Sequence, residues 1–144
     1  MTSNTTPSGE AKASRQVSGY EAYKAFNMEY GLSDYWSDNT VANWSNPTWL
    51  QYKFDTPVCA KRMTYRSIWS NIWYAKDFQI LASNDETNWV TLFEGNNSSD
   101  IDNIGEVVTI ELNNNEKYLY YRMNFLNSNG GNMMVNSLQL YGYK

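Results

Sequence analysis

The segment Arg66–Tyr74 concentrates side chains that could recognise a ligand. Its sequence, RSIWSNIWY, holds two tryptophans, a tyrosine, an arginine and an asparagine, whereas loops usually carry small polar residues. Aromatic planes cover the apolar face of a sugar ring, and guanidinium and amide groups satisfy its hydroxyls. Any one aromatic could instead pack on its own scaffold, but a cluster in one loop indicates a binding surface. The candidate contact residues are Arg66, Trp69, Asn71, Trp73 and Tyr74.

The composition argues against catalysis. The chain of 144 residues has no histidine, which removes the commonest general base, the usual zinc ligand and the Ser-His and Cys-His pairs. Its one cysteine, Cys59, falls in a predicted strand and is expected to be a small buried residue. Asp85 and Glu86 are adjacent at a hairpin tip, not opposed across a cleft, so they do not predict glycoside hydrolysis. We expect a protein that is not an enzyme.

The charge balance restricts the partners. The formal net charge is −4 and the pI about 4.7, whereas nucleic acids and anionic membranes select clustered Lys and Arg. No apolar run is long enough to span a bilayer. We therefore expect no nucleic-acid partner and no membrane insertion. High aromatic and amide content suits neutral polar ligands.

Short alternating segments must position the aromatic loop. An apolar residue at every second position, between turn signals, is typical of half-buried strands. One or two helical turns are expected over Tyr20–Phe26, and a long irregular loop over Asn27–Pro47. We predict an all-β, antiparallel jelly-roll sandwich of about eight strands, with a polar arm over residues 1–8 and one domain over 9–144. The predicted strands are Gly9–Ser14, Trp49–Phe54, Val58–Tyr65, Asp77–Ser83, Trp89–Phe93, Glu106–Leu112, Tyr118–Leu126 and Val135–Tyr143, with turns at Asp55–Pro57 and Asn84–Asn88.

Several fragments in this order carry a family resemblance. They are KAFN at 24–27, YWS at 35–37, WLQYKFDTPV at 49–58, KDFQILASNDETNW at 76–89, YLYYRMNF at 118–125 and SLQLYGY at 137–143. Together they resemble the discoidin domain, or coagulation factor 5/8 type C domain, and within it the bacterial and phage modules grouped with family 32 carbohydrate-binding modules. The resemblance implies a galactose-binding-domain-like jelly roll with its ligand site in loops at one end.

The resemblance also assigns individual residues. It places Arg66 and Asn71 at ligand positions and makes the loop Asn129–Asn132, followed by Met133 and Met134, the second wall of the site, so Asn129 and Asn132 join the candidate contacts. The family histidine after Trp36 is replaced by Ser37, which departs from galactose specificity. Trp36, Trp49 and Trp89 are expected to be structural. Glu86 replaces the usual hairpin glycine, so a positive φ there would cost of order 1 kcal/mol.

The family's structural calcium site is degenerate in this sequence. The resemblance places it near Asn27, Ser33, Asp34 and Ser137, with Asn27 in the place of an aspartate and Ser137 in the place of a glutamate. Calcium prefers charged oxygen ligands, so we expect no metal and no other cofactor. The remaining carbonyls and Asp34 could hold only a weakly bound calcium ion.

These observations predict a non-catalytic, lectin-like module that recognises a cell-surface or polysaccharide glycan through loops at one end of the sandwich. The alternative is a structural or adhesion module of a virion or cell-surface protein, in which the same aromatic loop binds another protein chain. Both place the chain outside the cell, at a cell surface or on a virion, within a larger protein or assembly. A sugar site would be a small groove with polar rims, whereas a protein interface would continue into neighbouring apolar surface.

Overall fold

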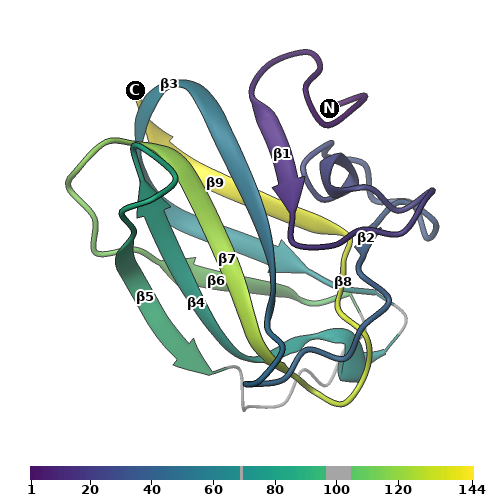
Figure 1. Cartoon of the computed structure of the whole chain (residues 1–144). Helices are drawn as coiled ribbons and strands as arrows, with labels where there is room; N and C mark the ends of the chain where they lie inside the picture. The colour runs from purple at the N-terminus through teal and green to yellow at the C-terminus, as the bar shows by residue number, and fades with distance from the viewer. Residues whose placement is uncertain (69, 97–104) are drawn as a thin grey trace.

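The computed structural model describes residues 1–68, 70–96 and 105–144, and it is an antiparallel β-sandwich (Figure 1). One layer has the strand order β1-β3-β7-β4-β5, and the second is formed by β6 and β9 on either side of β3. A small separate pair joins β2 to β8. Two short 3-10 turns, η1 and η2, interrupt the loops. The elements are β1 Glu10–Ala13, η1 Ala22–Ala25, β2 Trp36–Ser37, β3 Thr48–Arg66, η2 Asn71–Trp73, β4 Ala75–Ser83, β5 Val90–Asn96, β6 Val107–Glu111, β7 Tyr118–Ser128, β8 Met134–Val135 and β9 Ser137–Tyr143.

The long strand β3 belongs to both layers. Residues 48–53 pair with β7, and residues 62–66 pair with both β6 and β9. The predicted turn at 55–57 is wrong, because the strand continues through it. A register irregularity between Lys53 and Val58 lets the strand pass from one layer to the other without reversing. This half of β3, which includes Lys61, lies between β6 and β9.

The core lies between the layers and follows the predicted alternation. Tyr65, Met63, Ile80, Met123 and Phe125 are at most 1% exposed. Trp36 is fully buried and stacks on Phe125, with 5.9 Å between ring centroids. Cys59 is buried as well. The expected structural roles of Trp36 and Cys59 are therefore confirmed.

Trp49 and Trp89 pack on the outside of the five-stranded layer. The guanidinium carbon of Arg122 lies 4.1 Å from a ring centroid of each tryptophan, and its Nε and Nη2 donate to Gln51 Oε1 at 3.0 and 2.7 Å. A guanidinium between two indoles is a favourable cation–π arrangement. Both tryptophans are thus structural, as expected, but they stabilise the sheet from its outer face.

The hairpin between β4 and β5 forms as predicted. Asp85 accepts hydrogen bonds from the backbone N–H groups of Thr87 (2.9 Å) and Asn88 (2.7 Å). Glu86 has a φ of 61°, so it keeps the positive φ for which the family resemblance implies a strain. Its Oε1 accepts from Lys12 Nζ at 2.7 Å and Gln51 Nε2 at 3.0 Å, which offsets the backbone strain.

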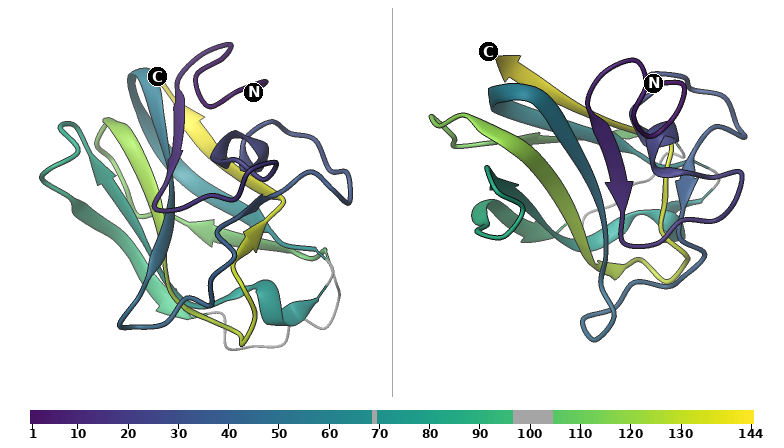
Figure 2. Two further views of the ribbon diagram at one scale, coloured as in Figure 1. Left: turned by 45° about the vertical axis from the view of Figure 1, so that its right-hand side comes forward. Right: turned by 45° about the horizontal axis from the view of Figure 1, so that its top comes forward.

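The two ends of the sandwich differ. Both chain termini lie at the upper end in Figure 1, whereas the loops that follow β2, β3 and β7 gather at the lower end (Figures 1 and 2). In the polar arm, Asn4 ties the chain to the domain, because its carbonyl accepts from Ala11 N at 2.7 Å and its Oδ1 from Tyr23 N at 2.9 Å. Within the described residues, no helix has the length and apolar character needed to cross a bilayer.

Candidate functional site

Three loops join at the lower end of the sandwich. They comprise residues 38–47, 70–73 and 129–132, and together we call them the end surface. Backbone hydrogen bonds connect them: Met133 N donates to Thr40 O at 3.1 Å, and Gly131 N donates to Ile72 O at 2.8 Å. Because each loop is held by its neighbour's backbone, the end surface is a single preorganised unit.

The loop 70–73 forms one 3-10 turn that presents its side chains outward. Ser70 Oγ accepts from Ile72 N at 3.4 Å, and Ser70 O accepts from Trp73 N at 3.3 Å. Asn71 and Ile72 are exposed, and Trp73 is half-buried. The Trp73 ring lies directly against Gly131, where an added Cβ would overlap it. Asn71 and Trp73 thus lie on the end surface, as expected.

The two predicted asparagines of the third loop join the neighbouring loops. Asn129 Nδ2 donates to Asn71 O at 3.3 Å, and Asn132 Nδ2 donates to Asn39 Oδ1 at 3.0 Å. The expected wall beside the 70–73 loop is therefore present. Met133 is fully buried and Met134 nearly so, so neither methionine forms part of the exposed wall.

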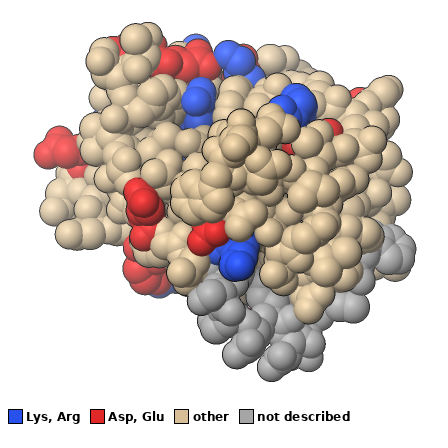
Figure 3. Space-filling model, turned by 60° about the horizontal axis from the view of Figure 1, so that its bottom comes forward, with Lys and Arg blue, Asp and Glu red and all other residues tan. Residues whose placement is uncertain are grey.

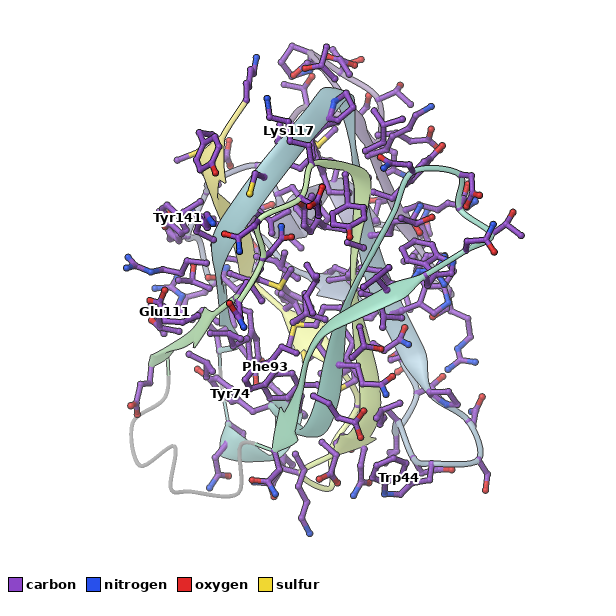
Figure 4. The ribbon with its side chains drawn as sticks, turned by 90° about the vertical axis from the view of Figure 1, so that its left-hand side faces the viewer. Trp44, Tyr74, Phe93, Glu111, Lys117 and Tyr141 are labelled. Carbon is purple, nitrogen blue, oxygen red and sulfur yellow. The ribbon has the colours of Figure 1, made fainter. Side chains whose placement is uncertain are left out.

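Trp44 belongs to the same end of the molecule and was not among the predicted contacts. It occupies the tip of a tight turn closed by Asn46 N, which donates to Asn43 O at 2.8 Å. Asn43 Oδ1 accepts from Ser45 N at 3.1 Å, as in an Asx turn. Trp44 is 63% exposed and lies at the bottom of the sandwich (Figure 4). The Asn-x-x-Asn pattern in a long aromatic loop could have indicated it.

An ion pair between a buried carboxylate and a partly exposed arginine supports the Trp44 turn. Asp38 has a fully buried side chain, and its Oδ2 lies 3.5 Å from Arg15 Nη2. Burial raises the pKa of Asp38, while hydrogen bonds from Thr40 and Thr48 and the charge of Arg15 oppose that shift. Arg15 Nη1 also donates to Asn46 Oδ1 at 3.0 Å. Arg15 thus connects the base of the loop to the turn that carries Trp44.

Tyr74 does not contact the exterior. It is 1% exposed, and its hydroxyl lies 2.9 Å from Ser67 O and 2.8 Å from Glu106 O. Burial raises the pKa of Tyr74. Its predicted role as a contact residue is therefore wrong: the hydroxyl contacts with Ser67 O and Glu106 O hold this ring in the core, where it supports the loop from beneath.

Arg66 is not part of the end surface either. Its Nε donates to Asn136 Oδ1 at 2.9 Å, and its guanidinium carbon lies 4.9 Å from the centroid of the Tyr30 ring. Neither partner belongs to the three end loops. The expected grouping of Arg66 with Trp73 is wrong because Arg66 still follows the strand alternation of β3. Trp69 lies outside the described residues.

Charged side chains are sparse at the centre of this end of the molecule. Figure 3 shows this face mostly in tan, with a basic patch beside an acidic one near the grey residues and further acidic patches toward its left side. Most of the described loop residues that carry the end surface are polar but neutral or aromatic. Such a surface suits a ligand that offers hydroxyls and an apolar face, as the loop composition predicts.

The loop of residues 27–35 was expected to hold the degenerate calcium site. Asp34 Oδ2 accepts from Asn27 Nδ2 at 2.7 Å, and Asp34 Oδ1 lies 4.0 Å from Lys24 Nζ. Asp34, one of the two carboxylates of the loop beside Glu29, therefore already faces an amide donor and an ammonium group. A calcium ion would have to displace both, and the cation would repel Lys24.

The backbone carbonyls of the same loop are also engaged. Asn136 Nδ2 donates to Asp34 O at 2.6 Å and to Gly31 O at 3.3 Å. Ser137 provides only a hydroxyl, and Ser33 is exposed. Among the described residues, no cluster of three or more His, Cys, Asp or Glu could hold a metal ion. The residues present do not fit calcium, because N–H donors point at the oxygens that it would need.

Solved structures share this fold at low sequence identity. A family 32 module of Clostridium perfringens, solved with GalNAc-β-1,3-galactose, has a TM-score of 0.77 and 17% identity over 93% of this chain and 95% of its own. The family 32 module of C. perfringens NanJ, solved with galactose, has a TM-score of 0.75 and 13% identity over 92% of both chains. Chitosan-binding module 1 of a Paenibacillus chitosanase/glucanase has a TM-score of 0.73 and 22% identity over 97% of this chain and 99% of its own.

The family follows from the sequence match. No protein with curated annotation matches this chain. The F5/8 type C domain, in contrast, matches residues 10–139, which covers every strand up to the middle of β9. With the antiparallel sandwich and its loops gathered at one end, this match identifies the chain as a member of the F5/8 type C, or discoidin, domain family.

Proposed function

We propose that this protein is a non-catalytic carbohydrate-binding module and that its end surface binds the glycan. Trp44 carries the proposal: a large aromatic side chain, 63% exposed, is held at the tip of a hydrogen-bonded turn. The apolar face of an exposed indole stays in contact with water until a ligand covers it. A sugar ring provides the matching apolar face.

The neighbouring loops supply the polar part of the site. Asn71 lies in the same loop as Trp73, and Asn129 and Asn132 flank Gly131, against which the Trp73 ring lies. The bonds between the loops fix their backbones before any ligand arrives. Preorganisation lowers the entropy cost of binding. The structural neighbours solved with galactose, GalNAc-β-1,3-galactose and chitotriose bind carbohydrates on the same fold, which supports the ligand class.

A shallow site of this kind binds a single sugar weakly, since each hydroxyl exchanges a bond to water for a bond to protein. Several copies in a larger assembly would raise the avidity without any new contact. The proposed setting is therefore extracellular, in a protein of a cell or virion surface that presents the module more than once.

A glycan array with the chain displayed multivalently tests the proposal. Trp44→Ala and Trp73→Ala are each expected to lower binding about tenfold or more, because an aromatic platform contributes on the order of 1–3 kcal/mol. Tyr143→Ala is the matched control, since Tyr143 is 54% exposed near the C-terminus, at the other end of the sandwich.

The array also separates this function from its rival. Binding of one glycan class that both tryptophan variants lose, with folding intact by circular dichroism, supports the sugar site. Binding to no glycan would reject it and favour the adhesion module that binds another protein chain through the same aromatic loop.

A further inference from the structure

A groove of about 240 Å³ lies on the outer face of the layer formed by β6, β9 and the second half of β3. The register places Thr64 beside Gln139 and Arg66 beside Ser137. Since Met63 and Tyr65 point into the core, the intervening Thr64 and Arg66 point outward. None of the lining residues belongs to the end surface. They are Tyr30, Thr64, Tyr65, Arg66, Val107, Ser137, Gln139 and Tyr141.

The guanidinium of Arg66 is fixed at this groove. Its Nε donates to Asn136 Oδ1 at 2.9 Å, and Nη2 donates to the same oxygen. The ring of Tyr30 lies against the guanidinium, with 4.9 Å between the Arg66 carbon and the ring centroid. Asn136 is 1% exposed and is itself held by two carbonyls. The cation is therefore preorganised at low entropy cost.

Two tyrosines form the aromatic rim. Gln139 Nε2 donates to the Tyr30 hydroxyl at 2.7 Å, and the Tyr141 hydroxyl donates to Gln139 Oε1 at 2.6 Å. Tyr30 is 53% exposed and Tyr141 45%. One side chain, Gln139, thus fixes both rings while they stay open to solvent.

The charge of the groove selects an anion. Among its described lining residues Arg66 is the one cation, and none is a carboxylate, although the chain as a whole carries a net charge of −4. A guanidinium matches a carboxylate geometrically, and hydrogen bonds to charged groups are stronger than neutral ones. The tyrosine rims add the planes that a sugar ring packs on.

We propose that this groove is a second binding site, separate from the end surface, that takes a carboxylate-bearing sugar residue. The choice of a sugar as the ligand rests on the proposed carbohydrate-binding function. A module that holds a glycan at its end gains avidity from a second contact on its flank. Arg66 binds the carboxylate, and Tyr30 and Tyr141 contact the ring.

The test measures binding of galacturonate, glucuronate and N-acetylneuraminate to the full chain by NMR titration, beside galactose and acetate. Gln139→Glu is the decisive variant, because it keeps the shape of the side chain and adds a carboxylate beside Arg66. We expect it to weaken acidic-sugar binding about tenfold or more. Asn113→Asp adds the same charge beyond the far end of β6 and is expected to change nothing.

A second pair of variants guards against loss of the Gln139 hydrogen bonds. Thr64→Glu is expected to weaken acidic-sugar binding. Thr64→Gln introduces a side chain of the same size as glutamate but without its charge, and it is expected to keep acidic-sugar binding. Trp44→Ala is also expected to keep it, so a failed end surface and a failed groove give different results.

Three outcomes would overturn the second site. They are no binding of any acidic sugar, binding unchanged in both Gln139→Glu and Thr64→Glu, and acetate or galactose binding as tightly as the acidic sugars. The last outcome would reduce the groove to a simple anion site or a neutral sugar site.

Discussion

The end surface and the loop of residues 27–35 are held in place by different kinds of bond. At the end surface, bonds between backbone groups, as from Gly131 N to Ile72 O, combine with side-chain bonds from Asn129 and Asn132. The 27–35 loop is tied to the rest of the chain by the side chain of Asn136, with Asn27 and Lys24 facing Asp34 within it. Because backbone bonds carry part of these connections, the aromatic side chains of Trp44 and Trp73 are not needed to hold the loops together. A loop held by side chains spends those groups on its own structure.

This difference has a consequence for evolution of the site. Substitutions of the end-surface side chains that make no bond between loops can change the ligand without loosening the loops, since backbone bonds remain. In the 27–35 loop, a change at one amide disconnects several partners at once. The following predictions test this contrast, beginning with the largest expected effect.

Asn136→Ala removes the acceptor of Arg66 and the donor to two carbonyls in one change. Because Asn136 is 1% exposed, its former partners lose bonds that water replaces poorly, and we expect a destabilisation of about 2–4 kcal/mol. Urea unfolding measures it, with Asn113→Ala at an exposed turn as the control. A loss below about 1 kcal/mol would show that the loop does not depend on this side chain.

Gly131→Ala tests the backbone-held region. The new Cβ would overlap the Trp73 ring and approach Ile72, so we expect a cost of about 1–3 kcal/mol from overpacking and a parallel loss of glycan binding as Trp73 moves. Gly130→Ala is the comparison: Gly130 has a φ of 105° with nothing within 4 Å of an added Cβ. It should cost about 1 kcal/mol and leave Trp73 in place. Equal binding losses in the two variants would contradict the direct contact.

Asp85→Asn tests how much the hydrogen bonds of an exposed carboxylate contribute to stability. Asp85 accepts from the backbone of Thr87 and Asn88 at the solvent-exposed hairpin. Hydrogen bonds from Asn88 and Thr87 lower the pKa of Asp85 below its usual 3.8. The stabilisation is thus present above pH 3.8 and is lost as the pH falls through the lower, folded-state pKa. We expect the wild type to exceed Asp85→Asn in stability at neutral pH, by less than the Asn136→Ala effect, and the gap to close in acid. A gap that stays constant from neutral pH to strong acid would be inconsistent with this assignment.

Calcium addition and chelation are expected to have no effect on the melting temperature. Lys24 and the amide groups of Asn27 and Asn136 already engage the Asp34 carboxylate and the Asp34 and Gly31 carbonyls, so an ion would have to displace these partners. Differential scanning calorimetry with calcium and with EDTA measures this. A rise in melting temperature that grows with calcium concentration would show specific binding and refute our assignment of the loop.

Local patterns were sufficient for much of the fold. The period-two alternation correctly predicted the inward faces of β4, β6, β7 and β9, because one face of each strand must be buried. The hairpin at 84–88 and the positive φ of Glu86 were likewise predictable from turn chemistry and family resemblance. Asp55–Pro57 misled the prediction, because turn formers also occur where a strand bends between layers.

The sequence by itself determined that this is an antiparallel sandwich with an aromatic, amide-rich loop, since composition and alternation are local properties. Only the tertiary structure decided which side chains meet. In the structure, Trp44 and Trp73 belong to neighbouring loops of the end surface, whereas Tyr74 points into the core. Arg66 contacts Asn136, 70 residues away in the chain. Neighbours along a loop need not share a surface, because strand alternation and contacts between distant loops set where each side chain points.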